Sequence, residues 1–445
     1  MGANLSSESL LAEQAARQNR VTGITMTATT ISVNLEPKIE ARYGRPDCKD
    51  PVTVHRYDQE VITVQGLGIH GRALRYVVKT VRLAYVNDAG QFVTFMAPLP
   101  GIRTDLLVTA EVVDRALYLT VDRNLSLSVA AAMLHDLYQV ETSSSALERW
   151  KAAAAEALPA IGQLIQQLNA QKPITALHLD EYKATGTKSW ELALRDEHGR
   201  LLFSIRLKKR DEWHITVILR WLRLLGLRIK VFYVDFWPAY PLAIRAVYPQ
   251  AAIQFDFFHV IQNIHRHLYK AFTAYRKAYR TANTAQEQAK VREALHKQLW
   301  ENRYLLFTNE ENLSAEQQQV LDDLLREHRD TLVEQIVVFR WYLRDIFNAS
   351  TSFAEAVEKL AFLILEGWAD VSSAFGKVMA FLQEHFANML TYLRVPGVQR
   401  NSLSECTVRS LRRIERIRQG FKTQQGRVNH LKLLQWRKYL QPASL

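Results

Sequence analysis

The chain has few cysteines and no long apolar run, and each absence removes a class of protein. Only Cys48 and Cys406 are cysteines among its 445 residues. Two cysteines cannot build a disulfide framework, and a four-ligand structural zinc site would need at least two further ligands beside them. No run of about 18 or more apolar residues is present, and no charged-then-apolar leader opens the chain. The sequence therefore predicts a cytoplasmic protein with no membrane association.

Basic residues outnumber acidic residues, and the excess is concentrated in one part of the chain. The formal net charge is +12. Residues 394–440 contain 12 Lys or Arg and 2 acidic residues, whereas residues 305–370 contain 5 Lys or Arg and 13 acidic residues. This asymmetry favours one surface that faces DNA and one that faces away from it. The alternative is that these charges are scattered over solvated faces.

The patterns before residue 171 predict three regions. Residues 1–50 are predicted to form a loosely ordered arm, because their first part is rich in Ser, Thr, Ala and Gln. Residues 51–100 contain β-branched runs and a turn sequence at Asn87, which indicates a small antiparallel β module. Residues 101–170 contain three short helical patterns. Their rhythm predicts a helix-turn-helix-like DNA-binding domain, and any three-helix packing unit gives the same rhythm.

The remaining patterns predict an RNase H-like core. Strands are predicted at residues 176–180, 190–194, 201–207, 230–235 and 251–255, with helices at 211–225 and 242–248. Together they make residues 171–260 the first part of the core, residues 261–395 a helical insertion, and residues 396–440 a C-terminal catalytic helix that ends the core. The predicted fold class is an α/β RNase H-like catalytic core with a large all-α insertion, preceded by the β module and the helical domain.

Three acidic residues have the positions that phosphodiester chemistry requires. Asp180 and Asp235 each end an apolar strand-like run, and Glu405 lies in an arginine-rich segment. Carboxylates from two strand ends and a helix can hold two Mg²⁺ ions over a phosphodiester. Asp235 is the most informative, because an aspartate after such a run would cost several kcal/mol if buried unpaired. The alternatives are a solvated turn for Asp180 and an ordinary salt bridge between Glu405 and Arg409.

Four motifs resemble those of DDE transposases of bacterial insertion sequences, most closely the ISL3 family. The motifs are Leu179-Asp180-Glu181, Val234-Asp235-Phe-Trp-Pro-Ala-Tyr240, Asp256-Phe-Phe-His259-Val260, and a last segment with Asn401, Glu405, Arg412-Arg413 and Gly420-Phe421. They occur in the family's order over about 60% of the chain. The resemblance implies that Asp180, Asp235 and Glu405 are the catalytic ligands of two Mg²⁺ or Mn²⁺ ions. Glu181, Asp256 and His259 are the predicted neighbours that support them.

Arginines surround the predicted glutamate ligand. Positions 405, 409, 412 or 413, and 416 share one face of a helix, which suits a metal ligand beside DNA phosphates. Glu415 is a competing acid that belongs to no motif of the family. The predicted DNA-binding residues are Arg409, Arg412, Arg413, Arg416, Lys422, Arg266 and Lys270.

The resemblance implies a transposase that binds the terminal inverted repeats of an insertion sequence and catalyses metal-dependent DNA cleavage and strand transfer. Its expected partner is double-stranded DNA, as transposon ends and as target, and its expected location is the bacterial cytoplasm, at the nucleoid when bound to DNA. A homodimer is expected because two ends must be paired. The alternatives are a domesticated, non-cleaving DNA-binding protein and an RNase H-like nuclease without strand transfer.

Overall fold

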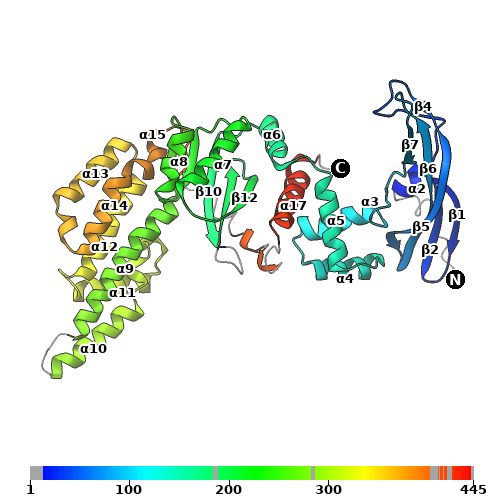
Figure 1. Cartoon of the computed structure of the whole chain (residues 1–445). Coiled ribbons are helices and arrows are strands. Elements are labelled where there is room, and N and C mark those ends of the chain that lie inside the picture. Colours follow the sequence, from blue (N-terminus) through cyan, green and yellow to red (C-terminus); the bar gives the residue numbers. More distant parts are fainter. Residues whose placement is uncertain are drawn as a thin grey trace. The chain divides into compact units, whose positions relative to one another are not determined.

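The structure is a computed structural model in which the chain divides into two compact units (Figure 1). It describes residues 14–183, 189–281, 286–400, 409, 411–413, 415–417 and 423–441. Unit 1 contains the described residues up to Leu168 and from Ser410 onward, and unit 2 contains those of Asn169–Lys183 and Ser189–Arg409. Among the described residues, no helix is long and apolar enough to span a membrane.

Unit 1 opens with the short helix α2 (Gln14–Gln18) and a mixed seven-stranded sheet. The strands run in the order β1-β2-β6-β5-β9-β8, with β7 beside β6. Their bounds are β1 (Arg20–Met26), β2 (Thr30–Glu36), β5 (His55–Ile69), β6 (Arg72–Val86), β7 (Phe92–Met96), β8 (Ile102–Arg103) and β9 (Val108–Thr109). Strands β3 (Arg42–Tyr43) and β4 (Val52–Thr53) form a separate pair.

This sheet corrects the prediction of a loose arm. Residues 20–36 form strands β1 and β2 rather than a loose arm, because Ile31, Val33 and Leu35 alternate and pack into the core beside Tyr76. A Ser- and Thr-rich composition concealed that alternation. Within residues 51–100 the strands β5, β6 and β7 pair antiparallel, whereas β2 and β9, which lie outside that range, run parallel to β6 and β5.

Four helices of unit 1 share one apolar cluster. They are α3 (Ala110–Leu117), α4 (Leu127–Tyr138), α5 (Ser144–Glu156) and α17 (Gln424–Gln435). The first three begin at the side-chain caps Thr109, Ser126 and Ser143, as expected for these residues at helix starts. Leu134 of α4, Leu147 of α5 and Leu433 of α17 are buried in the same cluster.

The position of α17 corrects the prediction that residues 396–440 complete the catalytic core. This helix packs against α5 in unit 1. Its Lys432 Nζ donates hydrogen bonds to the carbonyls of Ala155 at 2.6 Å and Leu158 at 3.1 Å.

On α5 itself, Lys151 is only 2% exposed and pairs with Glu148 at 3.2 Å, so it is not available to DNA. The helix-turn-helix-like role of residues 101–170 stays a prediction.

Unit 2 is built on a five-stranded sheet in the order β12-β11-β10-β13-β14. The strands are β10 (Ala176–Lys183), β11 (Trp190–Asp196), β12 (Leu201–Leu207), β13 (Val231–Val234) and β14 (Ala252–Phe255). The first three pair antiparallel, and β13 and β14 run parallel to β10. Helix α6 (Ile161–Gln171) leads into β10, and α7 (Glu212–Leu224) and α8 (Ala239–Val247) flank β13 in sequence. The mixed α/β character is confirmed, and the strand order is that expected for an RNase H-like core.

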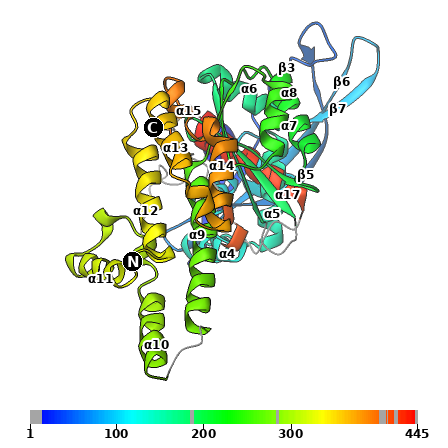
Figure 2. The same cartoon turned by 90° about the vertical axis from the view of Figure 1, so that its left-hand side faces the viewer.

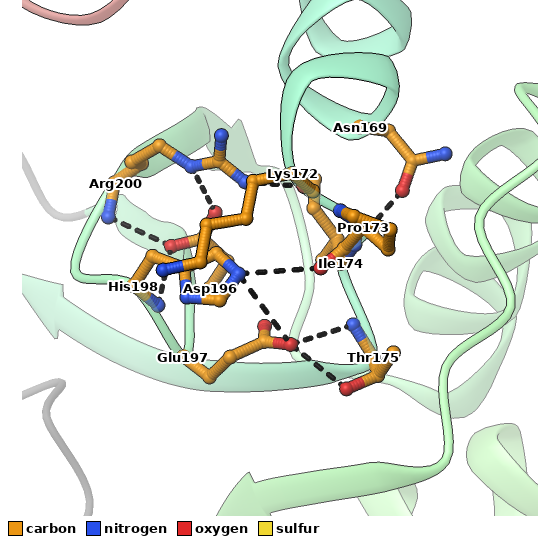
Figure 3. Close-up of polar contacts among 9 residues, drawn as sticks. All are labelled: Asn169, Lys172, Pro173, Ile174, Thr175, Asp196, Glu197, His198 and Arg200. Carbon is orange, nitrogen blue, oxygen red and sulfur yellow. Dashed lines mark hydrogen bonds and ion pairs between the residues drawn. The ribbon is translucent and has the colours of Figure 1, made fainter.

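A polar network closes the end of this sheet where β10 begins (Figure 3). Asp196 is fully buried and pairs with Arg200, whose Nε lies 2.6 Å from the carboxylate. Arg200 Nη2 donates to the carbonyl of Lys172 at 3.0 Å. Glu197 accepts hydrogen bonds from both the backbone N–H and the hydroxyl of Thr175, each at 2.8 Å. These contacts tie the β11–β12 turn to the start of β10 and so determine which residues reach the other end of that strand.

After β14 the described residues form helices and no strand up to residue 394 (Figure 2). The helices are α9 (Phe257–Thr281), α10 (Gln286–Glu301), α11 (Ala315–Glu327), α12 (Leu332–Arg344), α13 (Phe353–Leu365), α14 (Ser373–Met389) and α15 (Thr391–Arg394). The last two return to the sheet, because Gln254 Nε2 donates to the Met389 carbonyl at 2.9 Å and the Thr391 hydroxyl donates to the Ile253 carbonyl at 2.6 Å.

Candidate active site

Three aspartates lie toward the carboxyl ends of neighbouring strands in the sheet of unit 2. The strands β10, β13 and β14 are adjacent and parallel, so their carboxyl ends lie together, which is where ligands bind in open α/β sheets. Strand β10 is in register with β13 at His178 and Tyr233, and two residues further along this register Asp180 stands beside Asp235. Asp256 directly follows β14, next to Asp235. Two motifs that are distant in sequence are thus brought together.

The electrostatics of Asp180 agree with this placement. Burial raises the pKa of its carboxyl group to about 6, and the negative charges of Asp235 and Asp256 act in the same direction. The nearby His259 and the backbone N–H of Glu181, which donates to Asp180 Oδ1 at 2.7 Å, lower this pKa. A cluster of like charges at a half-buried strand end is favourable only when a cation joins it, and perturbed pKa values of this kind gather at functional sites.

The Asp235 carboxylate is held by two neighbours. The backbone N–H of Trp237 donates to its Oδ1 at 3.0 Å, and Arg210 Nη2 lies 3.6 Å from its Oδ2. Arg210 also forms an ion pair with the buried Glu181. Sequence patterns did not mark Arg210, although it ends the basic run Lys208-Lys209-Arg210 directly after a predicted strand. That basic run is the sequence signal by which Arg210 could have been predicted.

Asp256 and His259 belong to the beginning of α9. Asp256 Oδ1 accepts a hydrogen bond from the backbone N–H of Phe258 at 2.9 Å, the geometry of a helix cap. The positive end of the helix dipole is therefore turned toward the carboxylates, and it favours negative charge there. These two residues lie close enough to change the pKa of Asp180, so the structure brings them to the predicted site.

Glu405 and Lys422 lie outside the described residues, as does Asn401. The last described residue before Glu405 is Arg400, and the residues just before it contact β13. The backbone N–H of Gln399 donates to the hydroxyl of Tyr233 at 2.8 Å, and Val398 packs with the same tyrosine. The chain that leads to Glu405 is therefore anchored on β13, two residues before Asp235.

The site contains the oxygen donors of a magnesium centre without forming a complete one. Within the described ranges, no three His, Cys, Asp or Glu side chains lie together as a metal-binding group. Mg²⁺ is usually held by one or two carboxylates, with waters and substrate phosphates as its other ligands. Asp180 and Asp235 fit that pattern, since a divalent cation would offset the burial and the neighbouring negative charges that raise the pKa of Asp180.

The predicted arginines of the C-terminal segment are exposed and one competing acid is excluded. Residues 409, 411–413 and 415–417 are helical, and among them the predicted DNA-binding side chains are exposed: Arg409, Arg412, Arg413 and Arg416. Glu415 instead is buried and pairs with Arg427 at 3.0 Å. A glutamate neutralised by a buried arginine is a poor metal ligand, which removes the alternative to Glu405 among the described residues of this segment.

The predicted basic residues of α9 lie beside an aromatic groove. Arg266 and Lys270 are exposed and one helical turn apart. Arg266 lines a groove of about 590 Å³. The other residues that line it are Gln262, His265, Tyr269, Arg303, Tyr304 and Phe307. Exposed aromatic rings between arginines provide both stacking surface and phosphate-binding charge.

Residues 177–426 match the family model of DDE transposases of the ISL3 type, described as transposase. The chain belongs to this transposase family. The resemblance predicted from four sequence motifs is thereby confirmed, and the matched residues include both strand-end aspartates and Glu405.

Other comparisons add little. A search of curated proteins finds no match. Among solved structures, the Drosophila P element transposase strand transfer complex is similar over 79% of this chain and 95% of that chain, with a TM-score of 0.32 and 11% sequence identity. A likeness this weak carries no argument about the site.

Proposed function

We propose that this transposase binds the terminal inverted repeats of its element, cleaves the DNA there and joins the freed end to target DNA. Asp180, Asp235 and Glu405 would hold two divalent cations, Mg²⁺ or Mn²⁺. The observation that carries the proposal is the meeting of Asp180 and Asp235 at one sheet edge, with the pKa of Asp180 raised. When bound, the cations would neutralise the carboxylates and polarise the scissile phosphodiester.

Basic residues of the chain would hold the DNA. The exposed arginines at 409, 412, 413 and 416, together with Lys422, would contact phosphates near Glu405. Arg266, Lys270 and the groove on α9 would hold a neighbouring stretch of DNA. In this proposal residues 261–395 are an insertion into the core, residues 101–170 bind the end sequence, and two copies act together because two ends must be paired.

Two alternatives differ in the reaction that follows DNA binding. A domesticated copy would bind ends without cutting them, and an RNase H-like nuclease would cut without joining. The hydrogen bond from the Gln399 N–H to the Tyr233 hydroxyl holds the chain, six residues before Glu405, on the strand that precedes Asp235, and this supports a cleaving enzyme.

The test is a cleavage and joining assay with purified protein and a labelled duplex that carries the element's terminal repeat. Mg²⁺ or Mn²⁺ is added, and Asp235→Ala is compared with Asp322→Asn, which changes an exposed acid on α11. Metal-dependent nicking and joined product with wild type and Asp322→Asn, but not with Asp235→Ala, support the proposal. Tight binding without cleavage in either metal would leave a DNA-binding descendant, and cleavage without joined product would leave a nuclease.

A further inference from the structure

The positively charged guanidinium of Arg210 lies between two acids of the candidate site. The Arg210 side chain is 19% exposed, and it pairs with Glu181, whose side chain is 1% exposed. The same guanidinium reaches Asp235, where Nη2 lies 3.6 Å from Oδ2. Glu181 follows Asp180 directly on β10, so one guanidinium connects the two strands that carry the predicted metal ligands.

Two tryptophans keep this guanidinium in position. Its central carbon lies 4.4 Å from the ring centre of Trp190 on β11 and 4.5 Å from that of Trp237. The indole N–H of Trp237 donates to the backbone carbonyl of Arg210 at 3.3 Å, while its backbone N–H donates to Asp235 Oδ1. Trp237 thus contacts both the arginine and the carboxylate that the arginine faces. The guanidinium plane has little freedom to turn.

The geometry around Asp235 is that of an oriented ligand rather than a closed salt bridge. One carboxylate oxygen accepts the Trp237 N–H at 3.0 Å, which sets the rotation of the group. The other oxygen faces Arg210 at 3.6 Å, beyond the range of a good hydrogen bond, and so remains open to a metal ion. Metal-binding carboxylates are commonly oriented by such outer contacts.

The buried Glu181 explains why Arg210 stays in place. Burial raises the pKa of Glu181, and the charge of Arg210 lowers it. An ion pair of this kind adds little stability compared with an apolar pair of the same size. The ion pair instead fixes the orientation of Arg210, because Glu181 holds one side of the guanidinium while the other side faces Asp235.

From these contacts we propose that Arg210 is a positioning residue for the metal ligand Asp235, held for that purpose by Glu181, Trp190 and Trp237. The inference rests on the proposed function, since it requires that Asp235 binds a divalent cation. It assigns Arg210 an effect on metal affinity and not only on folding.

The experiment measures Mn²⁺ binding to the full chain without DNA, by calorimetric titration and by electron paramagnetic resonance. Arg210→Gln and Arg210→Lys are compared with Arg326→Gln, which removes an exposed arginine of α11. Both Arg210 variants are expected to weaken Mn²⁺ binding about 10- to 100-fold, because an amide and an ammonium each lack the planar fork. Arg326→Gln should bind as wild type.

Two results would overturn the proposal. Tighter Mn²⁺ binding by Arg210→Gln with unchanged binding by Arg210→Lys would mean that Arg210 only competes with the metal through its charge. Lower thermal stability with unchanged Mn²⁺ affinity in both variants would mean a purely structural role.

Arg210→Gln leaves Glu181 buried without its partner, so the double variant Glu181→Gln with Arg210→Gln keeps the test valid if the single variant does not fold. The double variant replaces the ion pair by two neutral amides. Since Glu181 acts through Arg210, the double variant should bind Mn²⁺ about 10- to 100-fold more weakly than wild type, the loss expected of Arg210→Gln alone. Mn²⁺ binding by the double variant as tight as that of wild type would overturn the proposal.

Asp235→Asn separates failure of this inference from failure of the proposed function. If Asp235→Asn removes Mn²⁺ binding and the Arg210 variants bind as wild type, the metal site stands and the role of Arg210 is wrong. If Asp235→Asn binds Mn²⁺ as wild type does, the proposed metal site is wrong, and the role of Arg210 is wrong with it.

Discussion

The two ends of the sheet of unit 2 use acidic residues in opposite ways. At the end where β10 begins, Asp196 is fully buried and its charge is matched by Arg200. At the other end, Asp180 lies beside Asp235 and Asp256, and the pKa of its carboxyl group rises to about 6. The polar groups of the first end hold a turn in place. The second end keeps negative charge that a cation could join, as expected for carboxylates with the proposed function.

The largest expected effect concerns the end of the sheet that carries Asp180. Asp180→Asn should lower DNA cleavage at least about a thousandfold, roughly 4 kcal/mol of transition-state stabilisation, because it removes a metal ligand. Cleavage rates with Mg²⁺ and an end-labelled duplex measure this. Asp322→Asn is the matched control, and retention of a tenth or more of wild-type activity in Asp180→Asn would exclude its role as a ligand.

The next effect tests the first end. Asp196→Asn should lower the free energy of unfolding by about 3 kcal/mol or more, because it leaves the charge of Arg200 buried without its partner. Urea denaturation followed by circular dichroism measures this change. An unchanged midpoint would mean that the network in Figure 3 is not structural, and the contrast between the two ends would fail.

Replacing Asp180 should raise the stability of the metal-free protein, whereas replacing Asp196 should lower it. The folded-state pKa of Asp180, about 6, exceeds the ordinary value of 3.8, so the folded protein holds this proton more tightly than the unfolded chain does. The contribution of this carboxyl group to stability therefore falls as pH rises between these two values. Metal-free Asp180→Asn should be more stable than wild type at neutral pH, by on the order of 1 to 3 kcal/mol.

Denaturation curves at several pH values check this prediction. The advantage of Asp180→Asn should shrink as the pH falls toward the ordinary aspartate pKa and disappear below it, where the wild-type carboxyl group is neutral in both states. Added Mn²⁺ should stabilise wild type and not the variant. A variant that is less stable than wild type at neutral pH would place Asp180 with the structural acids.

A smaller effect concerns DNA affinity. Replacing Arg266 and Lys270 together by glutamine should weaken DNA binding roughly tenfold at moderate salt. The slope of log affinity against log salt should fall by about one for each phosphate that the variant no longer binds. Gel-shift titrations at several salt concentrations measure both quantities. Arg326→Gln should leave them unchanged, and an unaltered salt slope in the double variant would remove α9 from the DNA interface.

The smallest expected effect concerns the approach to Glu405. Tyr233→Phe removes the hydroxyl that accepts the Gln399 N–H, a hydrogen bond worth about 1 kcal/mol, so cleavage should fall about fivefold. Mn²⁺ binding by Asp180 and Asp235 should persist. Equal cleavage rates for variant and wild type would mean that this anchor does not position Glu405.

Much of the site was predictable because its signals are local. An apolar run with an aspartate at its end predicts a strand that delivers a carboxylate. Asp235 directly follows β13 as predicted, and Asp180 lies within β10, which continues to Lys183. The caps Thr109, Ser126 and Ser143 likewise mark helix starts through hydrogen bonds only a few residues long. The family motifs are also short strings. The role of Glu405 stays a prediction, since it lies outside the described residues.

Other features depend on which distant segments pack together. A period-two run does not say whether its partner is parallel, so the pairing of β2 with β6 could not be predicted. The burial of Glu415 depends on Arg427, and the place of α17 depends on the apolar face of α5. Arg210 can reach Asp235 because β12 runs in the same direction as β10 and β13, so the segment after β12 lies at the same end of the sheet as Asp235.

The sequence by itself determined the strands of unit 2, the helix starts of unit 1 and the family, and it marked the acids predicted to carry the chemistry, because each is written in a few neighbouring residues. The tertiary structure decided that Asp180 stands beside Asp235, that Arg210 and Trp237 contact the latter, and that Asp196 is paired with Arg200 while burial raises the pKa of Asp180. These outcomes depend on burial and on charge across long chain separations, which no local pattern encodes.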